Sequence, residues 1–154
     1  MHIPDKISKW IRAKNWTLHE HQIRMFKSSE CSSQLLIAPT GSGKTLAGFL
    51  PTIADLYLNP SQKLHTLYIS PLKALASDIK RNLETPIKEL ELKISVEDRT
   101  GDTKQSIKKK QRVIPPNILL TTPESLALLM SYPEAPSIFS LSLIHISEPT
   151  RPSQ

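Results

Sequence analysis

The stretch "APTGSGKT", residues 38–45, decides the fold. It follows a short apolar run at residues 34–38 and precedes apolar positions at helical spacing, so it predicts a loop between a buried strand and a helix. The two glycines let the backbone turn its N–H groups inward around phosphate groups, and the positive end of the helix adds to that attraction. The stretch therefore predicts a phosphate-binding loop.

The polar residues of this loop have separate expected roles. Lys44 is the predicted catalytic residue, because its charge reaches the β and γ phosphates, and the Thr45 hydroxyl is the predicted Mg²⁺ ligand. The predicted nucleotide-binding residues of the loop are Thr40, Gly41, Ser42, Gly43, Lys44 and Thr45. The strict pattern has a glycine where Ala38 stands, so the match is to a variant form. The alternative is a glycine turn followed by an incidental Lys-Thr pair.

Gln22 lies upstream of the loop, in the segment "WTLHEHQ". Its amide donates and accepts at once, which suits the edge of adenine. On spacing alone, Gln22 fits equally well as a surface residue of a helix.

Composition narrows the class of protein. The chain has 154 residues, 38% hydrophobic and 22% charged, which fits one globular domain without a membrane span. The start of the chain has no apolar stretch behind a basic segment, and its single cysteine, Cys31, cannot form an internal disulfide, so we expect a cytoplasmic protein. The net charge of +6 fits a polyanionic partner and also fits a plain basic domain.

Strand-like and helix-like segments alternate along the chain. We expect strands at residues 34–38, 66–70, 94–96 and 118–121, and helices at 5–16, 20–27, 43–58, 72–83, 103–112 and 122–130. Pro51 is expected to kink its helix or to end a run of hydrogen bonds. Thr122 is the expected N-cap of the last helix, with Pro123 at its first position. The alternation predicts an α/β fold with a mainly parallel sheet flanked by helices.

Four ordered motifs give the chain a family resemblance. With the phosphate loop, the segments "HTLYISPLKALA", "RTGDT" and "PPNILLTTPESLALL" resemble the first RecA-like lobe of superfamily-two DEAD/DEAH-type helicases, and most of all the Lhr-like group with its ligase-associated DEXH-box DNA helicases. The resemblance covers about residues 10–140. It implies a P-loop NTPase lobe at residues 34–140, preceded by N-terminal helices with a Q-motif-like segment at residues 1–33.

The resemblance also implies residue roles. It assigns Gln22 to the adenine-reading Q motif and residues 40–45 to motif I. It assigns nucleic-acid contacts to Pro71, Leu72 and Lys73 of motif Ia, Gly101 of the glycine motif, and Thr122, Pro123 and Glu124 of motif Ib. Groups at strand-to-helix junctions contact phosphates and carry no base information, so the contact would be independent of sequence. For "SPLKALA" and "TTPESL", ordinary helix capping is the alternative.

The implied parent is an ATP-dependent DNA helicase that uses ATP and Mg²⁺, acts in DNA repair, and by analogy works with a DNA ligase and a nuclease. Two other functions stay open, namely another phosphate-loop NTPase such as a kinase, and a nucleotide- or nucleic-acid-binding module without catalysis. A basic cluster at Lys108, Lys109, Lys110 and Arg112 is either a second DNA contact or, as we expect, a solvated helix face.

The final stretch "LSLIHISEPTRPSQ", residues 141–154, falls where the family carries motif II, Asp-Glu-x-His, and no Asp-Glu pair occurs there. A degenerate motif is one explanation. The stretch resembles the translation of a sequencing adapter more closely, which implies that native sequence stops near Ser140, although its first six residues have the composition of a strand. We therefore expect this chain to lack measurable ATPase activity, to bind DNA weakly, and to leave a flank of the strand at 34–38 unpaired.

Overall fold

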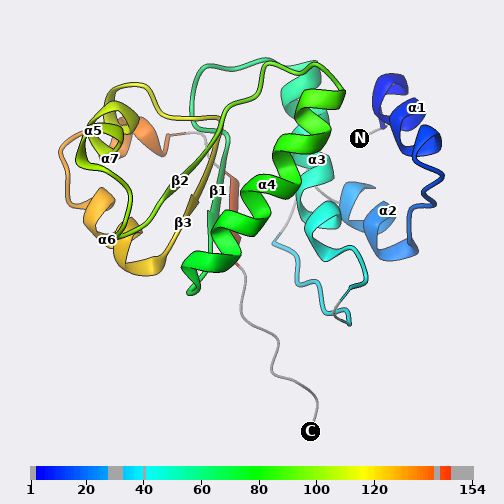
Figure 1. The fold of residues 1–154 in the computed structure, drawn as a ribbon, viewed down its shortest axis with the longest axis horizontal. Coiled ribbons are helices and arrows are strands. Elements are labelled where there is room, and N and C mark those ends of the chain that lie inside the picture. The colour runs from blue at the N-terminus through cyan, green and yellow to red at the C-terminus, as the bar shows by residue number, and fades with distance from the viewer. Residues whose placement is uncertain (1–2, 28–32, 40, 141–142, 147–154) are drawn as a thin grey trace, which may run out of the picture.

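The computed structural model describes residues 3–27, 33–39, 41–140 and 143–146 (Figure 1). Thr40, one of the predicted loop residues, lies outside the described residues, as does most of the stretch at 141–154. Within the described part of the chain, no helix is long and apolar enough to cross a bilayer.

A parallel sheet forms the centre of the molecule. Its strands are β1 (Thr66–Ile69), β2 (Val96–Arg99), β3 (Ile118–Thr121) and β4 (Leu143–Ile146). They lie in the order β2-β3-β1-β4, and every pairing is parallel. The predicted α/β class with a parallel sheet is therefore confirmed. β4 comes from the start of the terminal stretch that was expected to have strand composition.

Seven helices are described in the residues above. They are α1 (Asp5–Ala13), α2 (Glu20–Lys27), α3 (Lys44–Leu58), α4 (Lys73–Glu89), α5 (Gln105–Val113), α6 (Pro123–Met130) and α7 (Ala135–Ile138). In Figure 1, α4 crosses in front of the sheet, α1 to α3 lie on one side of the molecule, and α5 to α7 gather on the other. The short helix α7 has no counterpart in the sequence prediction.

The two faces of the sheet bury two separate cores. Tyr68, Ile118 and Leu120 belong to the larger core, which also contains buried residues of α1 to α4. Leu67 and Leu119, one position along each strand, belong to the smaller core beneath α6 and α7. This division follows from the alternation of side chains along a strand. Because both faces are buried, the strands β1 and β3 read as continuous apolar runs.

The strand predicted at residues 34–38 does not form. These residues have no regular secondary structure, and the side chains of Leu35 and Ile37 are 85% and 84% exposed. β1 is paired on both sides, by β3 and β4, and residues 34–38 pair with no strand of the described sheet. An apolar segment becomes a strand only when a neighbouring strand accepts its hydrogen bonds, and local composition does not supply that neighbour.

Pro51 does not end its helix. α3 runs without interruption from Lys44 to Leu58, with Pro51 buried inside it. The predicted kink, or the end of a run of hydrogen bonds at Pro51, stays a prediction. The packing of α3 against α2 and the larger core outweighs the missing backbone donor, since most helix stability in proteins comes from packing.

Candidate nucleotide-binding site and nucleic-acid interface

The phosphate-loop segment has the backbone conformation that its glycines allow. Gly41 and Gly43 have φ values of +81° and +75°, in the left-handed region that other residues rarely adopt. Ser42 closes the turn, because its hydroxyl donates to the carbonyl oxygen of Pro39 at 2.7 Å. Gly43 precedes α3, and no side chain caps that helix. The helix therefore begins with N–H groups that no side chain has taken up, which is the arrangement that binds anions.

Lys44 lies folded against its own loop. Its ammonium nitrogen donates to the carbonyl oxygens of Ala38 and Pro39, each at 2.6 Å. An ammonium group has three donors, so one remains available in this arrangement. The positive charge thus already lies at the loop, and binding of a phosphate needs only a local exchange of hydrogen bonds.

Gln22 is buried against the loop, with 3% of its surface exposed. Its Oε1 accepts from the backbone N–H of His19 at 2.8 Å, and its Nε2 donates to the carbonyl oxygen of Gly43 at 3.1 Å. The alternative of a surface residue is therefore wrong. A carboxamide has two N–H groups and two lone pairs, so one donor and one acceptor of Gln22 remain for a ligand.

A cavity of about 700 Å³ opens beside this contact. Its lining includes Gln22, Gly41, Gly43 and Thr45. The second half of α4 also lines the cavity, as does an aromatic wall formed by Trp10 and Trp16. The size lies in the range of small-molecule sites, and a lining that combines the phosphate loop with aromatic and apolar side chains fits a nucleoside triphosphate.

Glu89 holds the aromatic wall in place. Its Oε2 accepts from the indole N–H of Trp10 at 2.6 Å, and its Oε1 accepts from Lys14 at 2.8 Å. Hydrogen bonds first from Lys14 and then from Trp10 lower the pKa of the Glu89 carboxyl below its ordinary value. Trp10 meets Trp16 edge to face, with ring centroids 5.4 Å apart. The end of α4 is therefore fastened to the part of α1 that borders the cavity.

The three predicted nucleic-acid segments lie at one edge of the sheet. Each follows the carboxyl end of a parallel strand, and β1, β3 and β2 are neighbours, so their ends meet at the same edge. Hydrogen bonds join these ends, since the backbone N–H of Ser70 donates to Thr121 at 3.0 Å and the Thr121 hydroxyl donates to the carbonyl oxygen of Arg99 at 2.7 Å. The tertiary structure therefore brings together motifs that are far apart in sequence.

Lys73 of motif Ia and Gly101 of the glycine motif lie side by side in this interface. A Cβ atom placed on Gly101 would lie 3.4 Å from the ammonium nitrogen of Lys73. The same nitrogen forms an ion pair with Asp102 at 3.0 Å, and both side chains are largely exposed. Pro71, Leu72, Pro123 and Glu124 are exposed at the same edge.

The two helix N-termini at this edge differ. No side chain caps α4, whereas Thr122 caps α6 by accepting from the backbone N–H of Ser125. Thr122 is 3% exposed, and its hydroxyl is also 3.2 Å from that of Ser125. The predicted capping role of Thr122 is confirmed. The uncapped N-terminus of α4 is the stronger attractor for a phosphate group.

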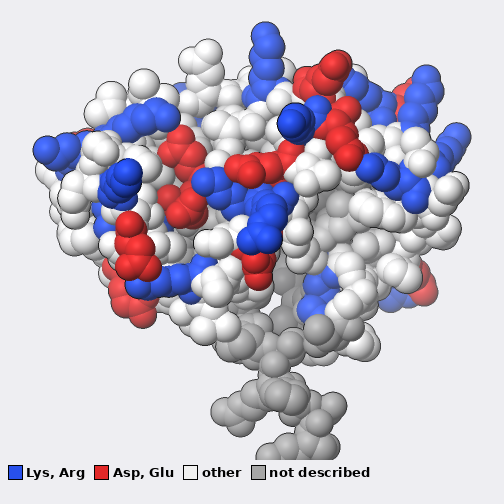
Figure 2. Space-filling view, viewed as in Figure 1, with Lys and Arg blue, Asp and Glu red and all other residues white. Residues whose placement is uncertain are grey.

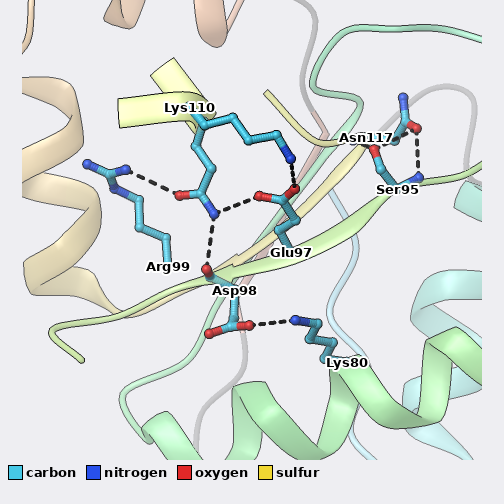
Figure 3. A network of polar contacts seen from close by, with 8 residues as sticks. Lys80, Ser95, Glu97, Asp98, Arg99, Lys110 and Asn117 are labelled. Atoms are coloured by element: carbon cyan, nitrogen blue, oxygen red, sulfur yellow. Dashed lines mark hydrogen bonds and ion pairs between the residues drawn. The ribbon is translucent and has the colours of Figure 1, made fainter. Parts of the chain in front are cut away.

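Charges of both signs alternate over the face that carries α4 and β2 (Figure 2). Figure 3 shows how β2 contributes, with Asp98 directed to Lys80 of α4 and Glu97 to Lys110 of α5. The hydrogen bond that Lys80 donates to the Asp98 carboxylate is the main cause that raises the pKa of Lys80 above its ordinary value, against the opposing effect of burial. Ion pairs of this kind hold α4 and α5 against β2, and they leave little net electrostatic potential at long range.

The basic cluster is not a uniform solvated face. Lys108 is only 9% exposed, and its Nζ donates to the carbonyl oxygen of Gly101 at 3.2 Å. Arg112 lies 4.1 Å from the ring centroid of Tyr132, and Lys109 is exposed. The expectation of a solvated face holds for Lys109 and is wrong for Lys108. Repeated lysines carry no signal in the sequence that separates the buried one from the exposed one.

Arg99 and Glu89 were missed by sequence reasoning. Arg99 is 1% exposed and donates to the carbonyl oxygen of Lys108 at 3.0 Å and to Oε1 of Gln111 at 3.2 Å. Burial is the main cause that lowers the pKa of its guanidinium below the ordinary value. Neither residue lies at a recognisable spacing from its partners, so no local pattern could have identified them.

Comparison with known sequences supports one family for the whole arrangement. The sequence profile of the DEAD/DEAH box helicases matches residues 19–146. The chain is 37% identical over 150 residues to ATP-dependent helicase Lhr-Core protein 2 of Thermococcus barophilus, covering 86% of this chain and 17% of that protein. It is 39% identical over 152 residues to ATP-dependent helicase Lhr-Core of Methanocaldococcus jannaschii, covering 87% of this chain and 18% of that protein.

Solved structures give the same result. The fold matches Mycobacterium smegmatis helicase Lhr bound to ssDNA and AMP-PNP with a TM-score of 0.83 and 35% identity, over 94% of this chain and 20% of that chain. It matches the DUF1998 helicase MrfA bound to DNA and AMPPNP with a TM-score of 0.82 and 30% identity, again over 94% and 20%. The chain thus spans about a fifth of these relatives. With its Lhr-like motifs and RecA-like fold, it belongs to the DEAD/DEAH box helicase family.

Proposed function

We propose that this chain is the ATP-binding lobe of an ATP-dependent DNA helicase of the Lhr type. The contact between Gln22 and Gly43 carries the proposal, because it joins the predicted adenine-reading residue to the predicted phosphate loop at the rim of one cavity. In this assignment Gly41, Ser42, Gly43 and the N-terminus of α3 surround the phosphates, and Lys44 neutralises them. Thr45, together with bound Mg²⁺, completes the site, and the metal supplies charge neutralisation at the phosphates.

The nucleic-acid partner in this proposal is DNA, held through its backbone. The exposed part of the interface consists of Pro71, Leu72, Lys73, Gly101, Pro123 and Glu124. In addition, α4 offers an uncapped N-terminus to a phosphate. Such contacts carry no base information, so binding would be independent of sequence. The two Lhr and MrfA structures that resemble this chain contain DNA, which supports DNA over RNA. The repair role, the ligase and nuclease partners and the cytoplasmic location stay predictions.

We also propose that the 154 residues bind ATP without measurable hydrolysis. No Asp-Glu pair occurs anywhere in the sequence, and the family uses that pair to order Mg²⁺ and the attacking water. The second candidate is a binding module without catalysis. Membership of the helicase family argues against a phosphate-loop kinase. A clear DNA-stimulated release of phosphate, abolished by Lys44→Ala, would overturn the proposed lack of hydrolysis.

Nucleotide binding tests the first proposal directly. The fluorescence of a methylanthraniloyl derivative of ATP is titrated with the chain in the presence of Mg²⁺. We expect saturable binding, and a loss of at least about tenfold in Lys44→Met, because one charge-assisted hydrogen bond contributes about 1.5–3 kcal/mol. Lys63 is an exposed lysine away from the loop, so Lys63→Met is the matched control and should bind the nucleotide like the wild type. Equal binding by the two variants would contradict the assignment.

Residues 141–154 are proposed to be adapter-derived. β4, Leu143–Ile146, pairs with β1 in the structure, and a short apolar segment of any origin can do so where an edge is available. The deciding observation is the genomic sequence beyond the codon for Ser140. A strand followed by Asp-Glu-x-His would support the complete helicase, whereas a stop codon after Gln154 would support the binding module.

A further inference from the structure

Lys108 differs from its neighbours because both its backbone carbonyl and its side-chain ammonium group form hydrogen bonds to the region of β2. Its carbonyl oxygen accepts from the buried guanidinium of Arg99 at 3.0 Å, and its ammonium group donates to the carbonyl oxygen of Gly101 at 3.2 Å. Lys108 is therefore fastened both to the end of β2 and to the loop that follows β2. Lys109, the next residue, is exposed.

The element that carries Lys108 is itself fixed to β2. Gln111, 2% exposed, accepts from Arg99 at 3.2 Å and donates to the carbonyl oxygen of Asp98 at 3.1 Å and to Glu97 at 2.9 Å. Figure 3 shows the labelled members of this network, with Arg99, Glu97 and Lys110 on the side of β2 that faces α5. α5 therefore has a defined position from which Lys108 can hold the loop.

The loop that contains Gly101 in turn lies next to Lys73, the exposed cation of the proposed nucleic-acid interface. Gly101 lies beside the ammonium group of Lys73, since a Cβ atom on Gly101 would be in van der Waals contact with that nitrogen, 3.4 Å away. The next residue, Asp102, forms the ion pair with Lys73. A displacement of Gly101 would therefore change both the space and the charge around Lys73.

We propose that Lys108 is a positioning residue for nucleic-acid binding, acting through the Gly101 loop on Lys73, and that it is not itself a phosphate ligand. The inference rests on the proposed function, which makes Lys73 a backbone contact. Lys108 is 9% exposed, and its ammonium group already donates to the carbonyl oxygen of Gly101, so its direct contact is with the loop and not with solvent. Its side chain thus sets the geometry of the loop, whereas Lys73 remains the group that meets the DNA.

Binding of a fluorescein-labelled oligo(dT) strand tests this proposal, measured by fluorescence anisotropy at low ionic strength and over a salt series. Lys73→Met should weaken binding by roughly fourfold at physiological salt, since one phosphate contact to a single strand contributes a salt exponent of about 0.7. Lys108→Met should weaken binding to a similar degree. Lys109→Met is the matched control and should stay within about twofold of the wild type.

The double variant Lys73→Met with Lys108→Met separates positioning from direct contact. If Lys108 acts through Lys73, the double variant binds no more weakly than Lys73→Met alone, because coupled residues are not additive. Losses that add would show an independent phosphate contact and would overturn the proposal. Thermal melting of each variant establishes that the comparison is made between folded proteins.

Lys108→Arg provides a second discrimination that keeps the charge. A phosphate ligand tolerates arginine, which binds phosphate in a bidentate manner, whereas a larger planar group at a 9% exposed position must shift the loop. We expect Lys108→Arg to bind more weakly than the wild type, and binding equal to the wild type would overturn the proposal. If Lys73→Met weakens binding and neither Lys108 variant does, only this inference fails. If the wild type and Lys73→Met bind equally, the proposed interface itself fails.

Discussion

The side-chain nitrogen of Gln22 lies 3.1 Å from the carbonyl oxygen of Gly43, across 21 positions of sequence. Gly43 adopts a φ of +75° at this contact, and a Cβ atom on it would lie 2.5 Å from the same nitrogen. Two features therefore favour glycine here. One is the left-handed backbone, and the other is the close approach of a buried amide.

Gly43→Ala should be destabilising and should weaken nucleotide binding. The left-handed backbone costs about 1–2 kcal/mol for a residue with a Cβ atom, and the new methyl group must also displace the amide of Gln22. Gly41→Ala is the matched control, since its φ is +81° but no atom lies within 4 Å of the added Cβ. Denaturant unfolding should place Gly43→Ala below Gly41→Ala in stability. Equal unfolding free energies would show that the Gln22 contact has no energetic role.

Glu89→Ala should loosen the aromatic wall of the cavity. Trp10 loses the acceptor of its indole N–H and Lys14 loses its ion pair, so the edge-to-face pair of Trp10 and Trp16 is no longer held against α4. These are the only two tryptophans in the sequence, so the emission spectrum reports on this pair alone. We expect a shift in the emission maximum and weaker binding of the ATP derivative. Glu84→Ala, exposed on the same helix, should change neither.

Asp55 should make stability depend on pH at the acid end. Burial alone would raise the pKa of its carboxyl, but hydrogen bonds from His65 and Asn59 outweigh that effect, so the pKa in the folded protein lies below the ordinary value of 3.8. A carboxylate only accepts, so Nε2 of His65, 2.8 Å from Oδ2 of Asp55, carries the proton of that hydrogen bond.

Because the folded pKa of Asp55 is the lower one, its contribution to stability is complete above the ordinary pKa and is lost as the pH falls through the folded pKa. Asp55→Asn should lower the unfolding free energy at neutral pH by about 0.5 to 1 kcal/mol, since the pair is partly exposed. The difference between wild type and variant should shrink as the pH falls below 3.8. Urea unfolding at neutral and acidic pH measures this difference in unfolding free energy. A difference that stays constant with pH would show that the Asp55 carboxylate does not cause the pH dependence.

Thr122→Val should destabilise the chain by about 1 kcal/mol through loss of the α6 cap. Valine has nearly the same shape, so the variant mainly leaves the N–H of Ser125 without its acceptor at a buried position. Thr122→Ser keeps the hydroxyl and should restore most of the stability. Thermal unfolding of the three proteins gives the comparison, and a Ser variant as unstable as the Val variant would contradict the capping assignment.

The sequence by itself determined the features that depend only on residues close together in the chain. Glycines at positions 41 and 43 allow a loop with left-handed backbone, and Thr122 with Pro123 specifies the start of a helix. The alternation of apolar strands with amphipathic helices likewise determined the α/β class, since each element must bury a face of its own.

What the sequence left open was decided by neighbours that lie far along the chain. Residues 34–38 have the composition of a strand, but no strand of the described sheet pairs with them. Lys108 and Lys109 are identical in sequence, and only the position of Gly101 makes one buried and the other exposed. Strand pairing and the burial of a charge each depend on a partner supplied by tertiary packing, and that partner has no local signature.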